Sequence, residues 1–226
     1  MKIKNVLKLE FEGFSLFEKI FFPLILLSTI IISILINDNK IALISALAGL
    51  SYTFLAGKGR VSCYFIGLIG TFCYCYISFK NGFYGNLALY GLYYLPMNVV
   101  GMIQWSKNFK KQTREIIKTK LKRKELLLYL CLMIISTFIL YFILLSNNDK
   151  NPIIDSITTI FSIFGQILTV KRCIEQWYIW IIVDILSLIM WIGAYLNNSN
   201  CFATIIMWLI YSFLGFYFLY KWKKEI

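Results

Sequence analysis

Long apolar runs dominate this chain of 226 residues and constrain its fold more than any other feature. Each run is about as long as the roughly 20 residues that a helix needs to cross a bilayer. The chain is 59% hydrophobic and 15% charged, whereas about 25% of a typical soluble domain is charged. The sequence therefore predicts an all-α polytopic membrane protein with eight transmembrane helices, at 20–36, 41–57, 61–79, 83–105, 126–146, 152–170, 175–195 and 201–220.

The positions of the basic residues orient these helices. If both termini are cytoplasmic, three of the 23 Lys and Arg residues lie outside, namely Lys40, Lys80 and Lys150, and the other 20 lie inside. Cytoplasmic loops of membrane proteins carry such an excess of basic residues. We therefore expect a multi-pass membrane protein with its N- and C-termini in the cytoplasm and its basic residues beside anionic lipid headgroups.

The long basic stretch at 106–125 is also consistent with a nucleic-acid site, because the net charge of the chain is +12. Single-stranded nucleic acid is usually bound by basic residues together with several aromatic platforms, and Phe109 is the one aromatic residue in this stretch. The stretch also lies between two predicted spans. We expect a cytoplasmic loop and no nucleic-acid partner.

The predicted helices form a 1 + 3 + 1 + 3 arrangement. The two three-helix units are expected to be parallel repeats because both begin on the outer side, and the linker helix between them makes this possible. The expected parts are a cytoplasmic or interfacial segment at 1–19, an extra first helix at 20–36, a first unit at 41–105, the loop at 106–125, the linker helix at 126–146 and a second unit at 152–222.

Short matches between the two units support an internal repeat. In the last helix of each unit a Tyr precedes a Trp by eleven residues, as Tyr94 precedes Trp105 and Tyr211 precedes Trp222. Basic residues also precede the middle helix in both units. Internal repeats of this kind are common in transporters.

One carboxylate lies deep inside a predicted span. Asp184 is near the middle of 175–195, and no Lys or Arg lies within any span to pair with it. A carboxylate there costs about 2.5–3.5 kcal/mol or more unless it faces a partner or a wet cavity. Trp177 and Trp180 precede it at spacings that place all three on one helical face. Two aromatic rings and an anion suit a ligand with a flat cationic ring and hydroxyl groups.

Tryptophan near a helix end is also typical of the membrane interface, and this alternative explains Trp177 better than Trp180. It does not explain Asp184. Three further polar residues, Asn98, Gln104 and Gln166, lie within predicted spans. Such residues bond to one another across helices as readily as they bind a substrate, so both roles remain open for them.

Several enzyme classes are excluded because the sequence lacks the residues or spacings that they require. The chain has no His, which removes His-dependent catalysis and His metal sites. Its six Cys residues are not spaced as metal ligands, and Gly57-Lys58-Gly59 lacks the phosphate-binding spacing of an ATPase. We expect a protein that is not an enzyme and that has neither a cofactor nor a metal.

The spacing Trp177-x-x-Trp180-x-x-x-Asp184 resembles the Trp-x-x-Trp-x-x-x-Asn/Asp motif of the PnuC family of bacterial vitamin transporters. The resemblance covers most of the chain after about residue 41. Four supporting stretches are Gly67–Gly70, Lys80–Gly85, Pro96–Trp105 and Gln166–Lys171.

This resemblance implies a function as well as a fold. It implies uptake of nicotinamide riboside by facilitated diffusion with alternating access, and trapping of the substrate by cytosolic phosphorylation. It also implies the parallel-repeat architecture shared with SWEET sugar carriers and, in many members, a homotrimer. Uptake of another vitamin, such as thiamine or riboflavin, is the alternative, and thiamine also carries a cationic ring.

The topology can be tested with cysteines introduced one at a time at Arg114, Asn148 and Ile226. In intact cells a membrane-impermeant thiol reagent should label position 148 and leave positions 114 and 226 unlabelled, because only 148 is expected outside. The unsubstituted protein measures the background from the native cysteines. Labelling at 114 without labelling at 148 would reverse the assignment.

Overall fold

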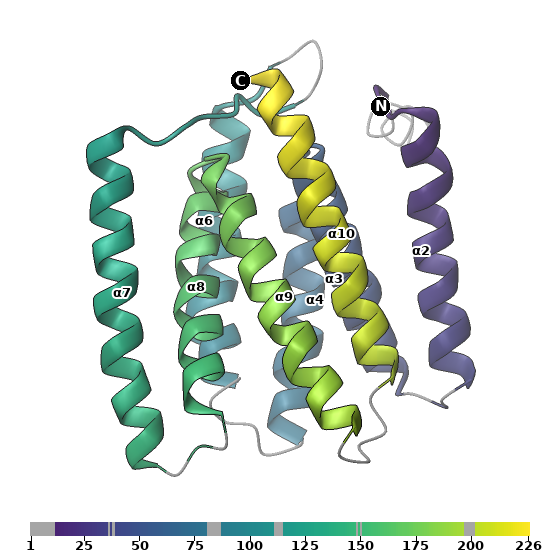
Figure 1. Ribbon diagram of the computed structural model, residues 1–226. Helices are drawn as coiled ribbons and strands as arrows, with labels where there is room; N and C mark the ends of the chain where they lie inside the picture. The colour runs from purple at the N-terminus through teal and green to yellow at the C-terminus, as the bar shows by residue number, and fades with distance from the viewer. Residues whose placement is uncertain are drawn as a thin grey trace. The chain divides into compact units, whose positions relative to one another are not determined.

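The described residues of the computed structural model are almost entirely helical. They comprise 12–35, 37, 39–80, 87–110, 115–147, 149, 151–196 and 202–226, so Arg114, Asn148 and most of the 80–85 stretch lie outside them. The helices are α2 (Leu16–Leu35), α3 (Lys40–Gly57), α4 (Ser62–Lys80), η1 (Leu89–Tyr94), α6 (Leu95–Lys107), α7 (Arg123–Ser146), α8 (Pro152–Val170), α9 (Glu175–Leu196) and α10 (Phe202–Glu225) (Figure 1).

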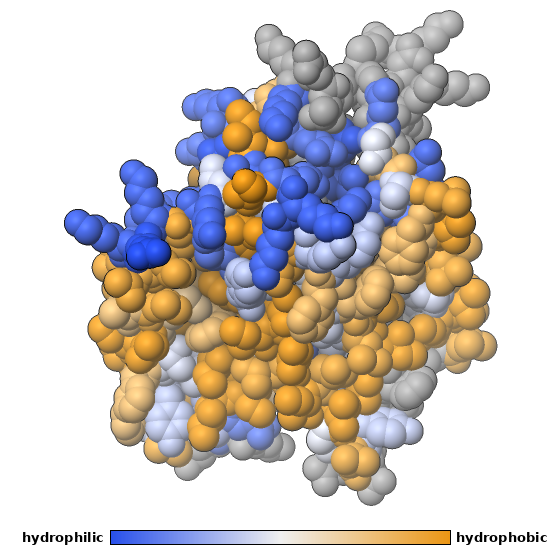
Figure 2. Space-filling view, turned by 45° about the horizontal axis from the view of Figure 1, so that its top comes forward, coloured by the Kyte–Doolittle hydropathy of each residue, from blue (hydrophilic) through white to orange (hydrophobic). Residues whose placement is uncertain are grey.

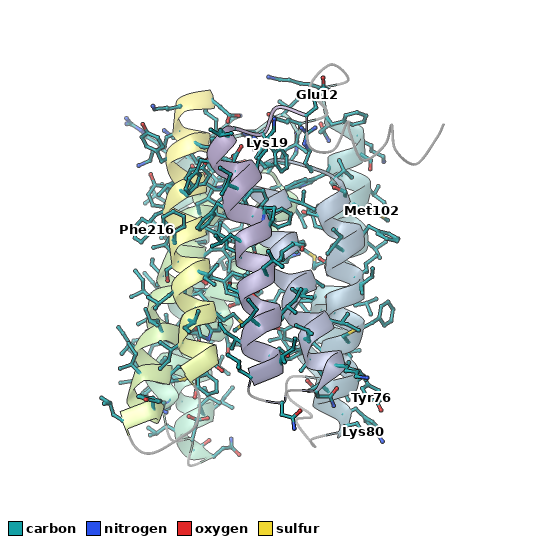
Figure 3. The ribbon with its side chains drawn as sticks, turned by 90° about the vertical axis from the view of Figure 1, so that its right-hand side faces the viewer. Glu12, Lys19, Tyr76, Lys80, Met102 and Phe216 are labelled. Carbon is teal, nitrogen blue, oxygen red and sulfur yellow. The ribbon has the colours of Figure 1, made fainter. Side chains whose placement is uncertain are left out.

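The helices confirm an all-α multi-pass membrane protein. Within the described ranges, seven helices are long and apolar enough to cross a membrane. Figure 2 shows apolar side chains along the helices and hydrophilic ones gathered near helix ends. In the first unit, Glu12 and Lys19 lie at one end of the helices and Tyr76 and Lys80 at the other (Figure 3), as successive crossings require.

The fourth of the eight predicted spans is not among these seven helices, because it is divided into η1 and α6. The N–H of Leu95 donates to the carbonyl oxygen of Tyr90, one residue further back than in an α-helix. Pro96 follows at once, and a proline ring clashes with the carbonyl four residues before it in a regular α-helix. The wider π-helical turn relieves this crowding. The chain is therefore π-helical immediately before Pro96.

Helix α2 begins at Leu16, four residues before the predicted first span at 20–36. Residues 12–13 form a turn, and residues 16–19 are already the first turn of the long helix. The N–H of Ser15 donates to Glu18 Oε2 at 2.7 Å, and the N–H of Glu18 donates to Ser15 Oγ at 3.2 Å. This reciprocal capping fixes the helix start.

The chain divides into two compact units, 1–117 and 118–226. In the first unit α2 packs on α3, α3 on α4, and α4 on η1 and α6. In the second unit α7 packs on α8, α8 on α9, and α9 on α10. Outward-facing apolar side chains such as Phe138 on α7 and Phe216 on α10 are exposed, and Phe216 points away from its helix in Figure 3. Such surfaces suit contact with lipid.

The turn after α3 and the turn after α8 have the same hydrogen bonds. Gly59 has φ of 67° and Arg172 has φ of 63°, both left-handed. In the first turn the N–H groups of Gly59 and Arg60 donate to the carbonyls of Ala56 and Leu55, each at 2.9 Å. In the second turn the N–H groups of Arg172 and Cys173 donate to those of Thr169 and Leu168, again at 2.9 Å. Both are Schellman motifs, which satisfy the free carbonyls of a helix end.

The connecting loop at 106–125 is hydrogen-bonded to both of these turns. The N–H of Ile116 donates to the carbonyl of Gly59 at 3.0 Å, and Ile116 is buried. Within the second unit, the N–H of Thr119 donates to the carbonyl of Arg172 at 2.9 Å, and Thr119 accepts from Ile174. The same loop therefore contacts the equivalent carbonyl in each unit.

Two basic residues expected at the lipid surface are also buried. Lys58 is 3.4 Å from Glu18 and 4.0 Å from Glu115, and it donates to the carbonyl of Gly13. Arg60 donates to the carbonyl of Glu12. These bonds attach the start of α2 to the turn after α3, so protein groups compensate the charges of both basic residues.

The Gly59→Ala substitution should destabilise the protein. A Cβ at this position would lie 3.0 Å from Ile116 Cγ1, and an L-residue is strained at φ of 67°. We expect a loss of roughly 1–2 kcal/mol, measured as a lower apparent melting temperature in detergent. Gly193→Ala is the matched control, because no atom lies within 4 Å of a Cβ there. Equal melting temperatures for Gly59→Ala and the unsubstituted protein would contradict the account of this turn.

Candidate ligand-binding site

The motif residues lie on α9, which packs between α8 and α10 in the second unit. The N-terminal end of α9 follows the Schellman turn, where the N–H of Gln176 donates to the carbonyl of Cys173 and the N–H of Trp177 donates to that of Ile174. The turn thus sets where the first residues of α9 begin. The motif side chains are distributed over the next two helical turns.

Asp184 is buried near the middle of α9, with 6% of its surface exposed. It faces α10 at Gly215, where a Cβ would lie 3.7 Å from Asp184 Oδ2. Tyr211, one helical turn earlier on α10, is close enough to feel the charge of the carboxylate. Within the described part of the chain, no hydrogen bond or ion pair joins Asp184 to another residue. The carboxylate is therefore available to a ligand.

Trp177 packs into the contact between α9 and α10. Its ring centroid lies 5.5 Å from that of Phe218 and 5.7 Å from that of Trp222, the latter edge to face. The side chain is 2% exposed, and its Nε1 has no hydrogen-bond partner among the described residues. Trp177 is therefore buried between α9 and α10, with an indole N–H that has no partner among the described residues.

Trp180 turns toward α8 instead. Its Nε1 donates to Thr169 Oγ1 at 3.1 Å, and that hydroxyl donates to the carbonyl of Gly165 at 2.8 Å. A Cβ at Gly165 would lie 3.1 Å from the Trp180 ring, so the ring occupies the space that glycine leaves. Trp180 thus meets α8, whereas Trp177 and Asp184 meet α10, so the side of α9 that carries the motif contacts both neighbouring helices.

The other expected site residues are divided between the two units. Gln166 is buried on α8, next to Gly165, and so lies in the unit that holds the motif. Asn98 is buried in the first unit, where its Nδ2 donates to Thr71 Oγ1 at 3.0 Å. Gln104 is exposed on the last turn of α6 and is not brought to Asn98. Four of the six expected residues therefore lie in the second unit.

Residue types beside the motif also shape this region. Gly165 and Gly215 let the side chains of Trp180 and Asp184 approach their neighbouring helices. A glycine inside a helical pattern is a sequence signal for such close approach, and both glycines lie within predicted helices. Thr169 and Tyr211 carry no comparable signal, because both residue types are common in apolar helices.

The arrangement can bind a ligand by two kinds of interaction. An ionised carboxylate accepts hydrogen bonds and attracts cations, and a half-buried indole ring offers a face to a cation. Asp184 and Trp180 lie one helical turn apart on α9 and supply these two groups. The region is thus suited to a small ligand with hydroxyl donors and a positive ring.

Comparison with known proteins identifies a family. A sequence model of the family described as nicotinamide mononucleotide transporter matches residues 39–224. A nicotinamide riboside transporter PnuC from Neisseria mucosa is 28% identical over 221 residues, covering 96% of this chain and 84% of the relative. One from Haemophilus influenzae is 28% identical over 229 residues, covering 100% and 98%.

A relative of known structure agrees with these matches. A crystal structure of the vitamin B3 transporter PnuC has a TM-score of 0.84 to this chain at 26% identity, covering 99% of this chain and 97% of the other. The resemblance to the PnuC family seen in the Trp-x-x-Trp-x-x-x-Asp spacing is therefore confirmed.

Proposed function

This chain belongs to the nicotinamide mononucleotide transporter family, and we propose that it carries nicotinamide riboside into the bacterial cell. The observation that carries this proposal is the buried Asp184 carboxylate, which no described residue compensates. Nicotinamide riboside has a cationic pyridinium ring and ribose hydroxyl groups, both of which a carboxylate attracts. The relatives named as nicotinamide riboside transporters support the same ligand.

The charge around Asp184 favours the riboside over its phosphorylated form. No Lys or Arg lies on α9, and the first basic residue on α10 is Lys221, near the C-terminal end of that helix. A phosphate group next to an uncompensated buried carboxylate would be repelled. The riboside carries no phosphate and avoids this cost.

In this proposal Trp180 and Asp184 have separate roles. The half-buried ring of Trp180 stacks on the pyridinium, and a cation over an indole face contributes about 0.5–2 kcal/mol. Asp184 accepts a hydrogen bond from a ribose hydroxyl, a role that an Asn at this position would also fill. The unsatisfied indole N–H of Trp177 and the buried amide of Gln166 are further groups of the same unit that a ligand with several acceptors would engage.

Transport then follows by alternating access without an energy source of its own. Phosphorylation of the riboside in the cytosol adds negative charge to the cargo, and the Asp184 carboxylate disfavours return of the charged product. Uptake is therefore driven by removal of the free riboside.

We also propose that both termini are cytoplasmic in an inner membrane. The excess of basic residues on one side supports this orientation. In the first unit the opposite placement of Lys19 and Lys80 agrees with it. The exposed basic residues of α10, Lys223 and Lys224, would then lie near anionic headgroups.

The two units are proposed to be parallel repeats of four helices each, which is the 1 + 3 + 1 + 3 arrangement divided at its midpoint. Support comes from the two Schellman turns, each of which accepts a bond from the connecting loop. Support also comes from the starts of α2 and α7, where Glu18 or Glu125 accepts a hydrogen bond from the N–H three residues before it. Glu18 is also 3.4 Å from Lys58, the lysine of the turn after α3. On this view α2 is the counterpart of the linker helix α7.

Binding by the purified protein tests the proposed function. Asp184→Ala and Trp180→Ala should each weaken binding of nicotinamide riboside, by about 5- to 30-fold for the tryptophan, which corresponds to about 1–2 kcal/mol. Equilibrium titration measures the affinity, with thiamine and riboflavin as competing candidates. Asp155→Ala, a carboxylate in the first turn of α8, and Phe213→Ala, an exposed ring on α10, are matched controls.

Tight binding of thiamine or riboflavin with none of the riboside would replace the proposed substrate. Losses as large in the two control variants as in the site variants would remove the proposed binding residues, since they would indicate a general loss of folding.

A further inference from the structure

One face of α10 carries polar groups that the Trp-x-x-Trp-x-x-x-Asp motif does not include. Three residues of α10, Tyr211, Ser212 and Gly215, come three, four and seven residues after Trp208. Residues at these spacings lie along one side of a helix. The ring centroids of Trp208 and Tyr211 are 5.8 Å apart. Of the four, Gly215 approaches Asp184 directly.

Two hydrogen-bonding groups on this face have no partner. The Nε1 of Trp208 and the Oγ of Ser212 are buried and bond to no described residue, and Ser212 is 9% exposed. A buried polar group that stays unsatisfied costs about 1–3 kcal/mol. Serine and threonine hydroxyls in helices usually recover this cost by bonding to a carbonyl one turn back, as Thr169 does with Gly165. The absence of that bond at Ser212 leaves its hydroxyl free for another acceptor.

These groups lie on the same side of α10 as Gly215, which meets the uncompensated carboxylate. Asp184 faces the turn of α10 between Tyr211 and Gly215, and Ser212 lies within that turn. Trp208 is one turn further along the same face. One carboxylate on α9 and two donors on the side of α10 that meets it are therefore without hydrogen-bond partners among the described residues.

We propose that Trp208 and Ser212 are specificity residues that donate hydrogen bonds to the ligand held at Asp184. This proposal rests on the proposed function. An ionised carboxylate only accepts hydrogen bonds and an indole N–H only donates them, so the two helices recognise opposite features of one molecule. Ribose hydroxyls donate to Asp184, while the oxygen atoms of the ribose or the carboxamide accept from Trp208 and Ser212. A ligand with a cationic ring but few acceptors would lose this second set of bonds.

The test compares Trp208→Phe and Ser212→Ala with the unsubstituted protein, using nicotinamide riboside as the probe. Each variant should bind the riboside about 3- to 10-fold more weakly, the range expected for one hydrogen bond. The melting temperature without ligand should stay the same or rise, because each substitution removes an unsatisfied polar group. The increase in melting temperature caused by the riboside should become smaller.

Ser78→Ala is the matched control, because Ser78 Oγ on α4 is also buried and without a partner among the described residues. It should leave riboside affinity unchanged. Ser212→Cys, which keeps the size of the side chain but donates more weakly, should fall between serine and alanine, and it replaces Ser212→Ala should that variant not fold.

The outcomes separate this inference from the proposed function. Full affinity in both Trp208→Phe and Ser212→Ala, with binding lost in Asp184→Ala, would overturn the donor role and leave the proposed function in place. A fall in the ligand-free melting temperature with unchanged affinity would show that the two groups are structural and would also overturn it. Failure of the unsubstituted protein to bind the riboside would instead overturn the proposed function.

Discussion

The buried carboxylate of Asp184 is the interaction on which the account of this protein depends. A charge inside a bilayer-spanning helix is costly unless something compensates it, and within the described residues nothing does. The second unit nevertheless accommodates it closely, with Gly215 leaving space on α10. A site that is complete except for a partner of opposite polarity is what a ligand-binding transporter requires. Pre-positioned groups of this kind reduce the ordering cost of binding.

The turns of the two units explain how the helices around this site are positioned. Each Schellman turn ends one helix, begins the next and accepts a bond from the connecting loop through an equivalent carbonyl, that of Gly59 or Arg172. The buried contacts of Lys58 with Glu18 and Glu115 add a second attachment in the first unit. Basic residues of the loops thus serve the fold as well as membrane orientation. Charge counting alone treats all of them as surface residues.

Hydropathy was sufficient to predict the helices, because a segment that crosses lipid must satisfy its backbone internally and therefore forms a long apolar helix. The motif containing Trp180 and Asp184 was also visible, because an acid in an apolar run is conspicuous. The partners of these residues were not visible. Which neighbouring helix a side chain meets depends on packing, so sequence spacing alone did not show that Trp180 bonds to Thr169 on α8. The unsatisfied donors of Trp208 and Ser212 appear only when every possible partner has a position.

The most direct measurement of the central claim is the affinity of wild type and Asp184→Asn for nicotinamide riboside and for its reduced, uncharged form. If Asp184 accepts a ribose hydroxyl, an amide oxygen at that position still accepts it. The account then predicts a mild loss of affinity that is similar for the charged and uncharged ligands. A tenfold loss for the cation with no loss for the neutral form would contradict it, because the carboxylate would then act as the partner of the pyridinium charge.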